Sequence, residues 1–435
     1  MNNQKDFLID TWQLRANLFF IINGIKNVVK DKKALCLSSL YWLFIIIVRR
    51  IILLNADVAN SFVSIRNSGR ASLLVIFSII IYIGYLLFKG KPKGAGKMMR
   101  DFIRIGLVNH VGETPLLIIR ESDSNNPDIY ILTFRNFGVS ISKWNDCKEQ
   151  IESGLNLNIE NIEENGKKYI IVKAVSGDTP LPTFIEWNKT LLPYGDFILA
   201  LGESYTGQVT VNLAKTPHIL IGGSTGSGKS ILLKLLLVQS VEKNAYVYIA
   251  DFKGGVDFPK IWHNKCTFIT EKENLIDTLN ELIAELHRRK KTFVDSDCAN
   301  IDEYNKKYNR HLRRIIFACD EVAELLDKTG LDKKSKDEIS EIEAAIATIA
   351  RLGRAFGIHL ILATQRPDAN IISGQIKNNI DFRVCGRADD VLSQIILDKT
   401  DASDVISKEA QGRFLTNTDT LFQGYWFDDS KWQEV

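Results

Sequence analysis

The stretch IGGSTGSGKS, Ile221 to Ser230, decides the fold of this 435-residue chain. From Gly223 onward it matches the spacing G-x-x-x-x-G-K-S, in which the glycines let the backbone curl around a phosphate. The apolar run HILIGG before it predicts a buried strand, and SILLKLLLVQSVE after it has helical spacing without a breaker. A helix that begins at such a loop points N–H groups at an anion. We therefore predict a nucleotide site rather than a plain glycine turn, formed by Gly222, Gly223, Ser224, Thr225, Gly226, Ser227, Gly228, Lys229 and Ser230.

Composition excludes several other classes of protein. The chain has 55 Lys and Arg against 52 Asp and Glu, so its formal net charge of +3 favours no particular partner. Its six cysteines form no C-x-x-C pair, and its six histidines show no metal-ligand spacing. A disulfide framework and a zinc site are both disfavoured.

The N-terminal hundred residues contain two long apolar runs, Ala34–Leu54 and Ala71–Phe88. The second run has 18 residues without a charge, and Arg49-Arg50 in the first can snorkel to an interface. Lysines precede the first run and follow the second, which by the positive-inside rule makes both flanks cytoplasmic. We predict a multi-pass anchor in the cell membrane within residues 1–98, with transmembrane helices at about 34–54 and 71–88. The alternative is a buried hairpin of a soluble protein.

The remainder divides into two predicted parts. Residues 99–180 contain short strand-like runs and one amphipathic helical stretch, SKWNDCKEQIESGLN, and indicate a small α+β module without a catalytic constellation. From 181 to 435 apolar strands alternate with helices, which is typical of a parallel α/β sheet.

Further candidate site residues follow three more apolar strands. Asp320 and Glu321 end RRIIFACDE, Gln365 follows IHLILAT, and Asp251 and Lys253 follow YVYIA. Because ligands bind at the carboxyl ends of parallel strands, these side chains are expected at one edge of the sheet. A nucleotide hydrolase needs a carboxylate for Mg²⁺ and a group that activates water, and Asp320 and Glu321 supply these two groups. The alternatives are a helix cap for Asp-Glu and a loop amide for Gln365.

Four stretches carry a resemblance. PHILIGGSTGSGKS, IIFACDEVAELL, ARLGRAFGIHLILATQRP and IKNNIDFRVCGRADDVLSQIIL occur in this order within about 184–429. Together they resemble the FtsK/SpoIIIE family of DNA-pumping ATPases. A membrane hairpin joined to such a motor is similar to the coupling proteins of Gram-positive conjugative elements. The resemblance implies a RecA-like P-loop motor that uses ATP and Mg²⁺, a hexameric ring around DNA, and relaxase and transfer-channel partners.

The same resemblance implies roles for single residues. Lys229 and Ser230 contact the phosphates and Mg²⁺, Asp320 belongs to the metal shell, and Glu321 is the general base. Gln365 falls on the sensor position of the family. Arg354 falls where the family places an arginine that reaches the neighbouring subunit's ATP, and Arg351, one helical turn away, is the alternative. An ordinary solvated side chain is the other interpretation of either arginine.

Three competing functions stay open at this point. The chain has no room after the motor for the winged-helix module of chromosome-segregation pumps, which favours conjugation. Type VII protein-export ATPases share the motor core but carry several such modules, whereas this chain has one P-loop. A non-catalytic nucleotide-binding scaffold has no need of Glu321. The candidate DNA contacts are Lys253, Lys377 and Arg383, each with ordinary surface charge as its alternative.

Overall fold

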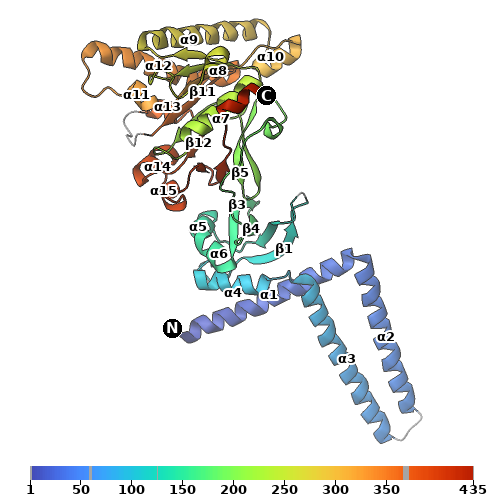
Figure 1. Cartoon of the computed structure of the whole chain (residues 1–435). Coiled ribbons are helices and arrows are strands. Elements are labelled where there is room, and N and C mark those ends of the chain that lie inside the picture. Colours follow the sequence, from blue (N-terminus) through green and yellow to red (C-terminus); the bar gives the residue numbers. More distant parts are fainter. Residues whose placement is uncertain (1, 58–60, 125, 366–371, 435) are drawn as a thin grey trace. The chain divides into compact units, whose positions relative to one another are not determined.

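The computed structural model describes residues 2–57, 61–124, 126–365 and 372–434 (Figure 1). The chain forms two compact units, Met1–Thr179 and Pro180–Val435. The three predicted domains, 1–98, 99–180 and 181–435, remain predictions.

Two apolar helices of the first unit form a hairpin. They are α2 (Lys32–Asp57) and α3 (Ser61–Gly90). Mean hydropathy is 2.0 over Lys32–Leu54 and 2.5 over Ile65–Gly90, and only 11% and 17% of these stretches is buried. By length and composition both helices can cross a membrane. Both predicted transmembrane segments lie within them.

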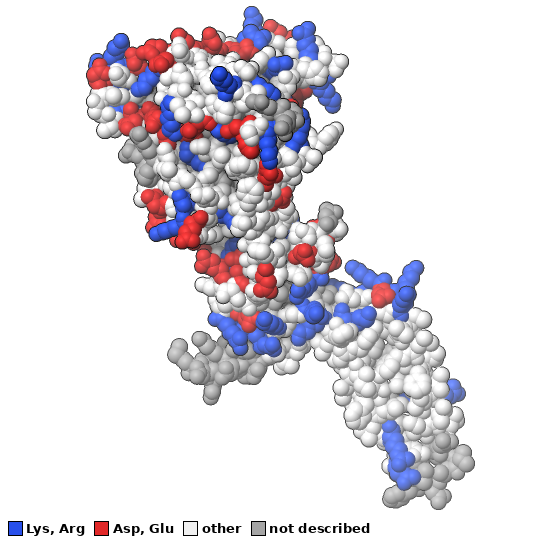
Figure 2. Space-filling model, viewed as in Figure 1, with Lys and Arg blue, Asp and Glu red and all other residues white. Residues whose placement is uncertain are grey.

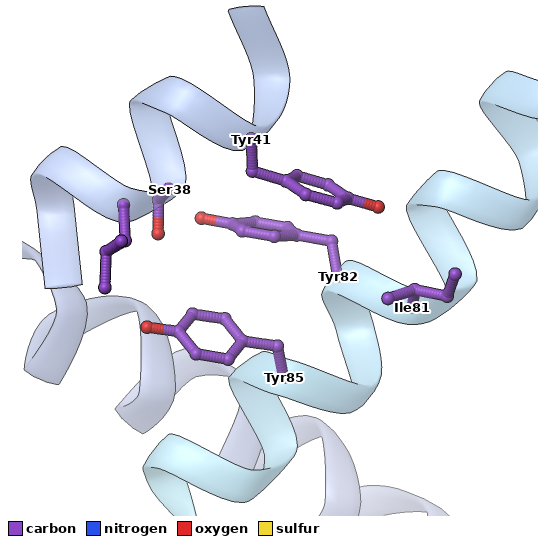
Figure 3. Close-up of a pocket in the computed structure, with 6 residues that line it drawn as sticks. Ser38, Tyr41, Ile81, Tyr82 and Tyr85 are labelled. Carbon is purple, nitrogen blue, oxygen red and sulfur yellow. The ribbon is translucent and has the colours of Figure 1, made fainter. Parts of the chain in front are cut away.

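Aromatic side chains join the two helices of the hairpin. Figure 3 shows Tyr41 of α2 stacked beside Tyr82 of α3, with ring centroids 6.0 Å apart. The Tyr41 hydroxyl donates a hydrogen bond to the Ser78 carbonyl at 3.0 Å, so its polar tip is satisfied within the apolar surface. A pocket of about 220 Å³ lies against these rings.

A third long helix, α1 (Asn2–Lys30), was not predicted from the sequence. It crosses α3 at two glycines, Gly24 and Gly90. A Cβ atom at Gly24 would lie 2.0 Å from the Leu86 carbonyl oxygen, so only glycine allows this approach. The Asn23 side-chain amide donates to the Gly90 carbonyl at 3.1 Å and fixes the crossing.

The small α+β module shares a core with α1. Its four-stranded antiparallel sheet has the order β1-β2-β4-β3. Trp12 of α1 donates from Nε1 to Thr114 Oγ1 at 3.1 Å and packs in one cluster with Phe102, Phe134 and Trp144. The predicted helix SKWNDCKEQIESGLN forms as two helices that meet at Cys147. The elements are α4 (Ala95–Ile105), β1 (Leu116–Ser122), β2 (Ile129–Arg135), α5 (Ile141–Asp146), α6 (Lys148–Leu155), β3 (Leu157–Asn165) and β4 (Tyr169–Ser176).

The second unit is built on one ten-stranded sheet with the order β6-β5-β14-β13-β12-β7-β11-β10-β8-β9. The six strands from β12 to β9 are parallel, and the other four add on as antiparallel neighbours. The strands are β5 (Ile198–Ser204), β6 (Gly207–Asn212), β7 (Ile219–Gly222), β8 (Tyr246–Ala250), β9 (Thr267–Ile269), β10 (Ile315–Cys319), β11 (Ile358–Thr364), β12 (Phe382–Cys385), β13 (Arg413–Thr416) and β14 (Leu421–Gly424).

Helices cover both faces of this sheet. On one face α9 and α12 contribute Leu279 and Ile346 to a buried cluster, and on the other α7 and α8 contribute Leu233 and Trp262 to a second. The central strands are therefore buried on both sides, which is why their sequences are continuous apolar runs. The helices are α7 (Lys229–Glu242), α8 (Lys260–Lys265), α9 (Lys272–Asp295), α10 (Ile301–Tyr308), α11 (Val322–Leu326), α12 (Lys333–Phe356), α13 (Gly374–Lys377), α14 (Asp390–Leu397) and α15 (Asp401–Val405), with 3₁₀ turns η1 (Lys189–Leu191) and η2 (Asp429–Glu434).

The predicted fold class is confirmed. The unit is a mixed α/β P-loop domain, and β11 lies between the P-loop strand β7 and the strand β10 that ends before Asp320.

Candidate functional site

The P-loop joins β7 to α7 as predicted, and two of its glycines have left-handed backbone. Gly226 has φ 76° and Gly228 has φ 98°, a region that costs other residues strain. A Cβ atom at Gly228 would also lie 3.0 Å from the Gly412 Cα atom. Glycine is thus required at Gly228 both for its dihedral angles and for the approach of a distant loop.

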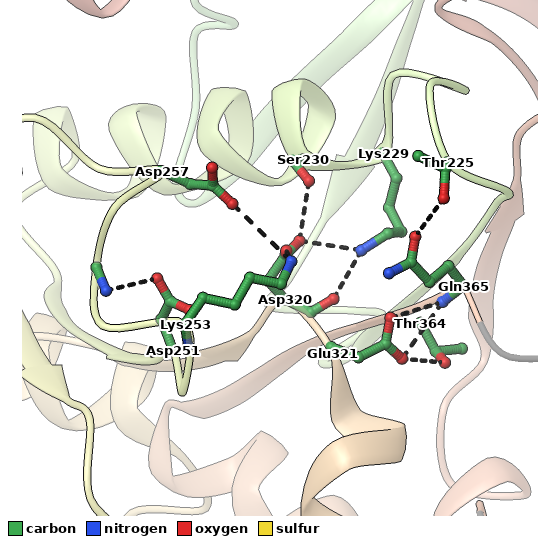
Figure 4. Close-up of polar contacts among 11 residues, drawn as sticks. Thr225, Lys229, Ser230, Asp251, Lys253, Asp257, Asp320, Glu321, Thr364 and Gln365 are labelled. Carbon is green, nitrogen blue, oxygen red and sulfur yellow. Dashed lines mark hydrogen bonds and ion pairs between the residues drawn. The ribbon is translucent and has the colours of Figure 1, made fainter.

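Lys229 and Asp320 form a buried ion pair at the centre of the site (Figure 4). Lys229 Nζ lies 2.7 Å from the Asp320 carbonyl oxygen and 3.0 Å from Asp320 Oδ1, and each side chain belongs to a residue only 6% exposed. Ser230 Oγ donates to the same Oδ1 at 3.1 Å, and Lys253 Nζ lies 3.2 Å from Oδ2. Three donors, two from the first turn of α7 and one from the loop after β8, therefore meet one carboxylate.

These neighbours control the charge of Asp320. Burial raises the pKa of the Asp320 carboxyl, but the positive charges and hydrogen bonds of Lys229 and Lys253 outweigh burial and hold its pKa below the usual value. In turn the Asp320 charge raises the pKa of Lys253 against the opposing effect of burial. The aspartate is ionised at neutral pH, as a metal ligand must be.

Glu321 is oriented by the next strand rather than by a lysine. The Thr364 hydroxyl donates to Glu321 Oε1 at 2.6 Å, and the Gln365 backbone N–H donates to Oε2 at 3.0 Å. Gln365 also accepts, through its side-chain oxygen, a 3.0 Å hydrogen bond from the Thr225 hydroxyl of the P-loop. The end of β11 thus connects the P-loop to the acidic pair, and the sequence analysis assigned no part in this to Thr364.

Arg387 holds the P-loop from outside, and the sequence analysis missed it. Its guanidinium donates to the Thr225 carbonyl at 2.6 Å and to the Lys408 carbonyl at 2.6 Å, and its own carbonyl accepts from Ser224 N at 2.7 Å. The residue follows β12, the neighbour of β7, so its position depends on strand order. The signal in the sequence was its place in the stretch CGRADDVL, which carries no phosphate-binding pattern.

A pocket of about 400 Å³ opens beside the P-loop. Its wall includes Gly226 and Gly228 of the P-loop, and Ile231 and Leu232 of the first turn of α7. The rest comes from segments distant in sequence, namely Thr183, Phe184, Gln411, Gly412, Phe414, Gln423, Gly424, Tyr425 and Trp426. Glycines and aromatic faces make this a mostly apolar space next to the predicted phosphate site.

Arg354 and its alternative Arg351 lie far from the P-loop of their own chain. Both are exposed on the last turns of α12, and Arg354 Nε donates to the Ala214 carbonyl at 3.4 Å. Ala214 precedes β7 and α12 ends before β11, so these arginines lie at the amino ends of strands whose carboxyl ends form the site. One chain alone does not bring them to its own nucleotide.

The three candidate DNA contacts are ion-paired within the unit. Lys253 pairs with Asp320, and Lys377 and Arg383 both pair with Asp398. Their charges are therefore partly neutralised by neighbours.

The oxygen atoms at the site fit a magnesium ion. The Ser230 hydroxyl and the Asp320 carboxylate are adjacent, and Mg²⁺ is usually held by one or two protein oxygens together with substrate phosphates. Within the described ranges no cluster of three or more His, Cys, Asp and Glu could hold a metal by itself. A metal here would need the nucleotide as a co-ligand.

Comparison with known proteins gives the family. Residues 184–369 match the FtsK/SpoIIIE family. A solved structure of the conjugation coupling protein TcpA of pCW3, in a monomer form with ATPγS, is 37% identical, covers 78% of this chain and 97% of that chain, and gives a TM-score of 0.57. The chain belongs to the FtsK/SpoIIIE family.

Members of this family among curated proteins are longer than the matched region. The DNA translocase FtsK of Caldanaerobacter subterraneus subsp. tengcongensis is 32% identical over 49% of this chain and 30% of its own length. The FtsK of Treponema pallidum is 32% identical over 56% of this chain and 31% of its own. The chain thus spans less than a third of these relatives.

The FtsK/SpoIIIE match supports ATPase activity and explains which residues the sequence revealed. It includes the P-loop, Asp320, Glu321, Arg354 and Gln365. It ends before Arg387 and before the segment 411–426 that lines the pocket. The last residues of the stretch ATQRP, Arg366 and Pro367, lie outside the described residues.

Proposed function

We propose that this protein is a membrane-anchored ATPase that moves DNA, and that it serves as the coupling protein that feeds DNA of a conjugative element into a transfer channel. The observation that carries this proposal is the likeness to the pCW3 coupling protein, which extends over 97% of that chain. The apolar helices α2 and α3 supply the anchor. Lysines at both ends of the hairpin support a cytoplasmic position for the motor, by the positive-inside rule.

ATP would bind with its phosphates at the P-loop and its base in the adjacent pocket of about 400 Å³. Lys229 now donates to Asp320, and on ATP binding we expect its ammonium to turn to the β- and γ-phosphates. Ser230 and Asp320 would hold Mg²⁺, which neutralises phosphate charge when bound. Arg387 fixes the loop at Ser224 and Thr225 in either state.

Glu321 would accept a proton from the water that attacks the γ-phosphorus. As the new P–O bond forms, the bond to the bridging oxygen breaks and ADP leaves with that electron pair. Thr364 and the Gln365 N–H keep the carboxylate oriented, because each of its oxygens accepts a hydrogen bond from the end of β11. The Gln365 side-chain amide, whose oxygen accepts a hydrogen bond from the Thr225 hydroxyl, lies close enough to the P-loop to act as a γ-phosphate sensor.

The position of Arg354 supports a ring of subunits. Since Arg354 lies at the sheet edge opposite to the P-loop of its own chain, the ATP that it could contact is the one bound to a neighbouring subunit. An arginine supplied in this way makes hydrolysis depend on assembly. We propose a hexamer with DNA in its channel, and relaxase and channel proteins as partners.

The test is ATP turnover by the full chain in lipid nanodiscs against increasing duplex and single-stranded DNA at two salt concentrations. DNA should stimulate turnover, and stimulation should weaken at higher salt because phosphate contacts release counterions. Glu321→Gln serves as the inactive control. Stimulation by a small secreted helical protein but not by DNA would favour the export class instead. Loss of chromosome segregation, with conjugative transfer intact, after deletion of the gene would favour a segregation pump.

A further inference from the structure

One face of α1 is an exposed apolar stripe. Leu14, Leu18, Ile22, Ile25 and Val29 recur every three or four residues and lie within an arc of about 80° at 3.6 residues per turn. Each is between 46% and 70% exposed. No residue within the described part of the chain covers this stripe, and an apolar face of this length in water is costly.

The opposite face of α1 is buried. Trp12, Ala16 and Phe20 are at most 5% exposed and pack in the core of the α+β module. The stripe therefore points away from the module. Figure 1 shows α2 and α3 leaving α1 on the side away from the β1–β4 sheet. Because the face of α1 opposite to the stripe packs in the module, the stripe is turned away from that sheet as well.

The crossing with α3 sets the level of α1 relative to the bilayer that the hairpin would cross. Gly24 and Gly90 bring the two backbones into contact at the last turn of α3, where the apolar stretch Ile65–Gly90 ends. If α3 crosses a bilayer, this turn lies at the bilayer surface. A helix crossing there lies in the interfacial plane, continuous with the apolar surface of the hairpin.

Positive charge surrounds the same level of the molecule. Figure 2 shows Lys and Arg gathered where α1 and α4 adjoin the hairpin, whereas most of the hairpin surface carries no charge. Anionic headgroups attract such juxtamembrane bases. The exposed lysines at this level include Lys26, Lys30, Lys32, Lys33, Lys91 and Lys93.

We propose that α1 is an interfacial helix whose stripe, Leu14 to Val29, lies in an anionic lipid surface and seats the module against the membrane. Interfacial helices of this kind bury their apolar face about 5–10 Å into the headgroup boundary. The inference rests on the proposed anchor, because the hairpin must cross the bilayer for α1 to reach it. The interfacial helix would add a membrane contact of a second kind beside the two membrane-spanning helices.

The experiment uses the full chain in vesicles of phosphatidylcholine with about 30% phosphatidylglycerol. Single cysteines that carry the fluorophore NBD are placed at Leu18 and Ile22 on the stripe, at Gln13 on α1 off the stripe, and at Ile79 in α3. Lipids brominated near the headgroup report interfacial contact, lipids brominated deep in the chain report spanning, and aqueous iodide reports exposure. The accessible native cysteines Cys36, Cys266 and Cys298 are first replaced by serine.

We expect shallow bromines to quench the labels at Leu18 and Ile22 about threefold more than the label at Gln13, with iodide access reduced to match. The double variant Leu18→Glu/Ile22→Glu should make a label at Ile25 accessible to iodide. The control Gln13→Glu adds a charge off the stripe and should leave the Ile25 label shielded from iodide. Stronger quenching with added phosphatidylglycerol supports the role of the lysines.

The Ile79 label separates the two proposals. Quenching of Ile79 by deep bromines, with stripe labels open to iodide, would overturn the interfacial helix and leave the anchor standing. Stripe labels shielded from iodide but unquenched by bromine would mean that protein covers the stripe, which also overturns the proposal. An unquenched Ile79 would remove the anchor, and the interfacial helix with it.

Discussion

Replacing Glu321 by glutamine removes the proposed base and leaves the shape of the site. Glu321 accepts hydrogen bonds from the Thr364 hydroxyl and the Gln365 N–H. Glutamine keeps one oxygen acceptor for the Gln365 N–H, and its amide can donate to the Thr364 hydroxyl, which rotates to accept. The free energy of unfolding should therefore change by less than the ~1–3 kcal/mol that an unsatisfied buried group costs.

Turnover should respond far more strongly than stability. Loss of a general base lowers the rate by about 10²–10⁴-fold, so kcat for ATP should fall by that factor while the Kd for ATP stays near wild type. The assay measures phosphate release in the presence of DNA, with ATPγS binding measured on the same preparation.

The matched control is Glu242→Gln, at the other end of α7. Glu242 pairs with Lys189 at 2.8 Å and accepts from Trp432 at 3.3 Å, remote from the P-loop. It should leave kcat unchanged. An assembled Glu321→Gln protein that binds nucleotide and turns over at the wild-type rate would refute the assignment of the base.

Three further predictions follow from the same geometry. Lys229→Ala should weaken ATP binding, and it should also destabilise the unit by about 3–5 kcal/mol because Asp320 loses its principal buried counter-ion. ATPγS titration measures the first effect and urea denaturation the second, and an unchanged affinity for ATPγS would contradict the role of Lys229 at the phosphates. Arg354→Ala should abolish DNA-stimulated turnover in a pure ring, yet rings mixed with Glu321→Gln subunits should recover part of it, because arginine and base come from different chains at each interface; equal turnover in pure and mixed rings would speak against a contribution in trans. Burial lowers the pKa of His218 from 6.5 to about 4, so between these pH values the unfolded chain binds a proton that the folded chain does not. The contribution of His218 to the free energy of unfolding should therefore fall by about 3 kcal/mol as the pH drops from 6.5 to 4. A flat profile in urea denaturation across this range would be inconsistent with a buried neutral imidazole.

Much of the site could be predicted because its parts follow strands. The P-loop, Asp320, Glu321 and Gln365 each come directly after an apolar run, and parallel strands bring their carboxyl ends to one edge. Local sequence therefore indicates both the residue and its place. The apolar lengths of α2 and α3 are local in the same sense, since hydropathy over about 20 residues depends on nothing distant.

Other features could not be predicted because they depend on which segments become neighbours. Arg387 reaches the P-loop only because β12 pairs with β7, and the pocket beside it needs 411–426 to return across the sheet. In α1, polar residues and Gly24 interrupt the apolar pattern, and packing against α3 and the module explains them only after folding.

The sequence by itself indicated the P-loop, the alternation of strands and helices in the second unit, and the two apolar helices. Each of these depends on residue types at short spacing. Only the tertiary structure decided the hydrogen bonds of Thr364 to Glu321 and the position of Arg354 at the far edge from its own P-loop. The physical reason is that sheet order and helix crossings are set by long-range packing, and a buried donor finds its acceptor only when that packing is complete.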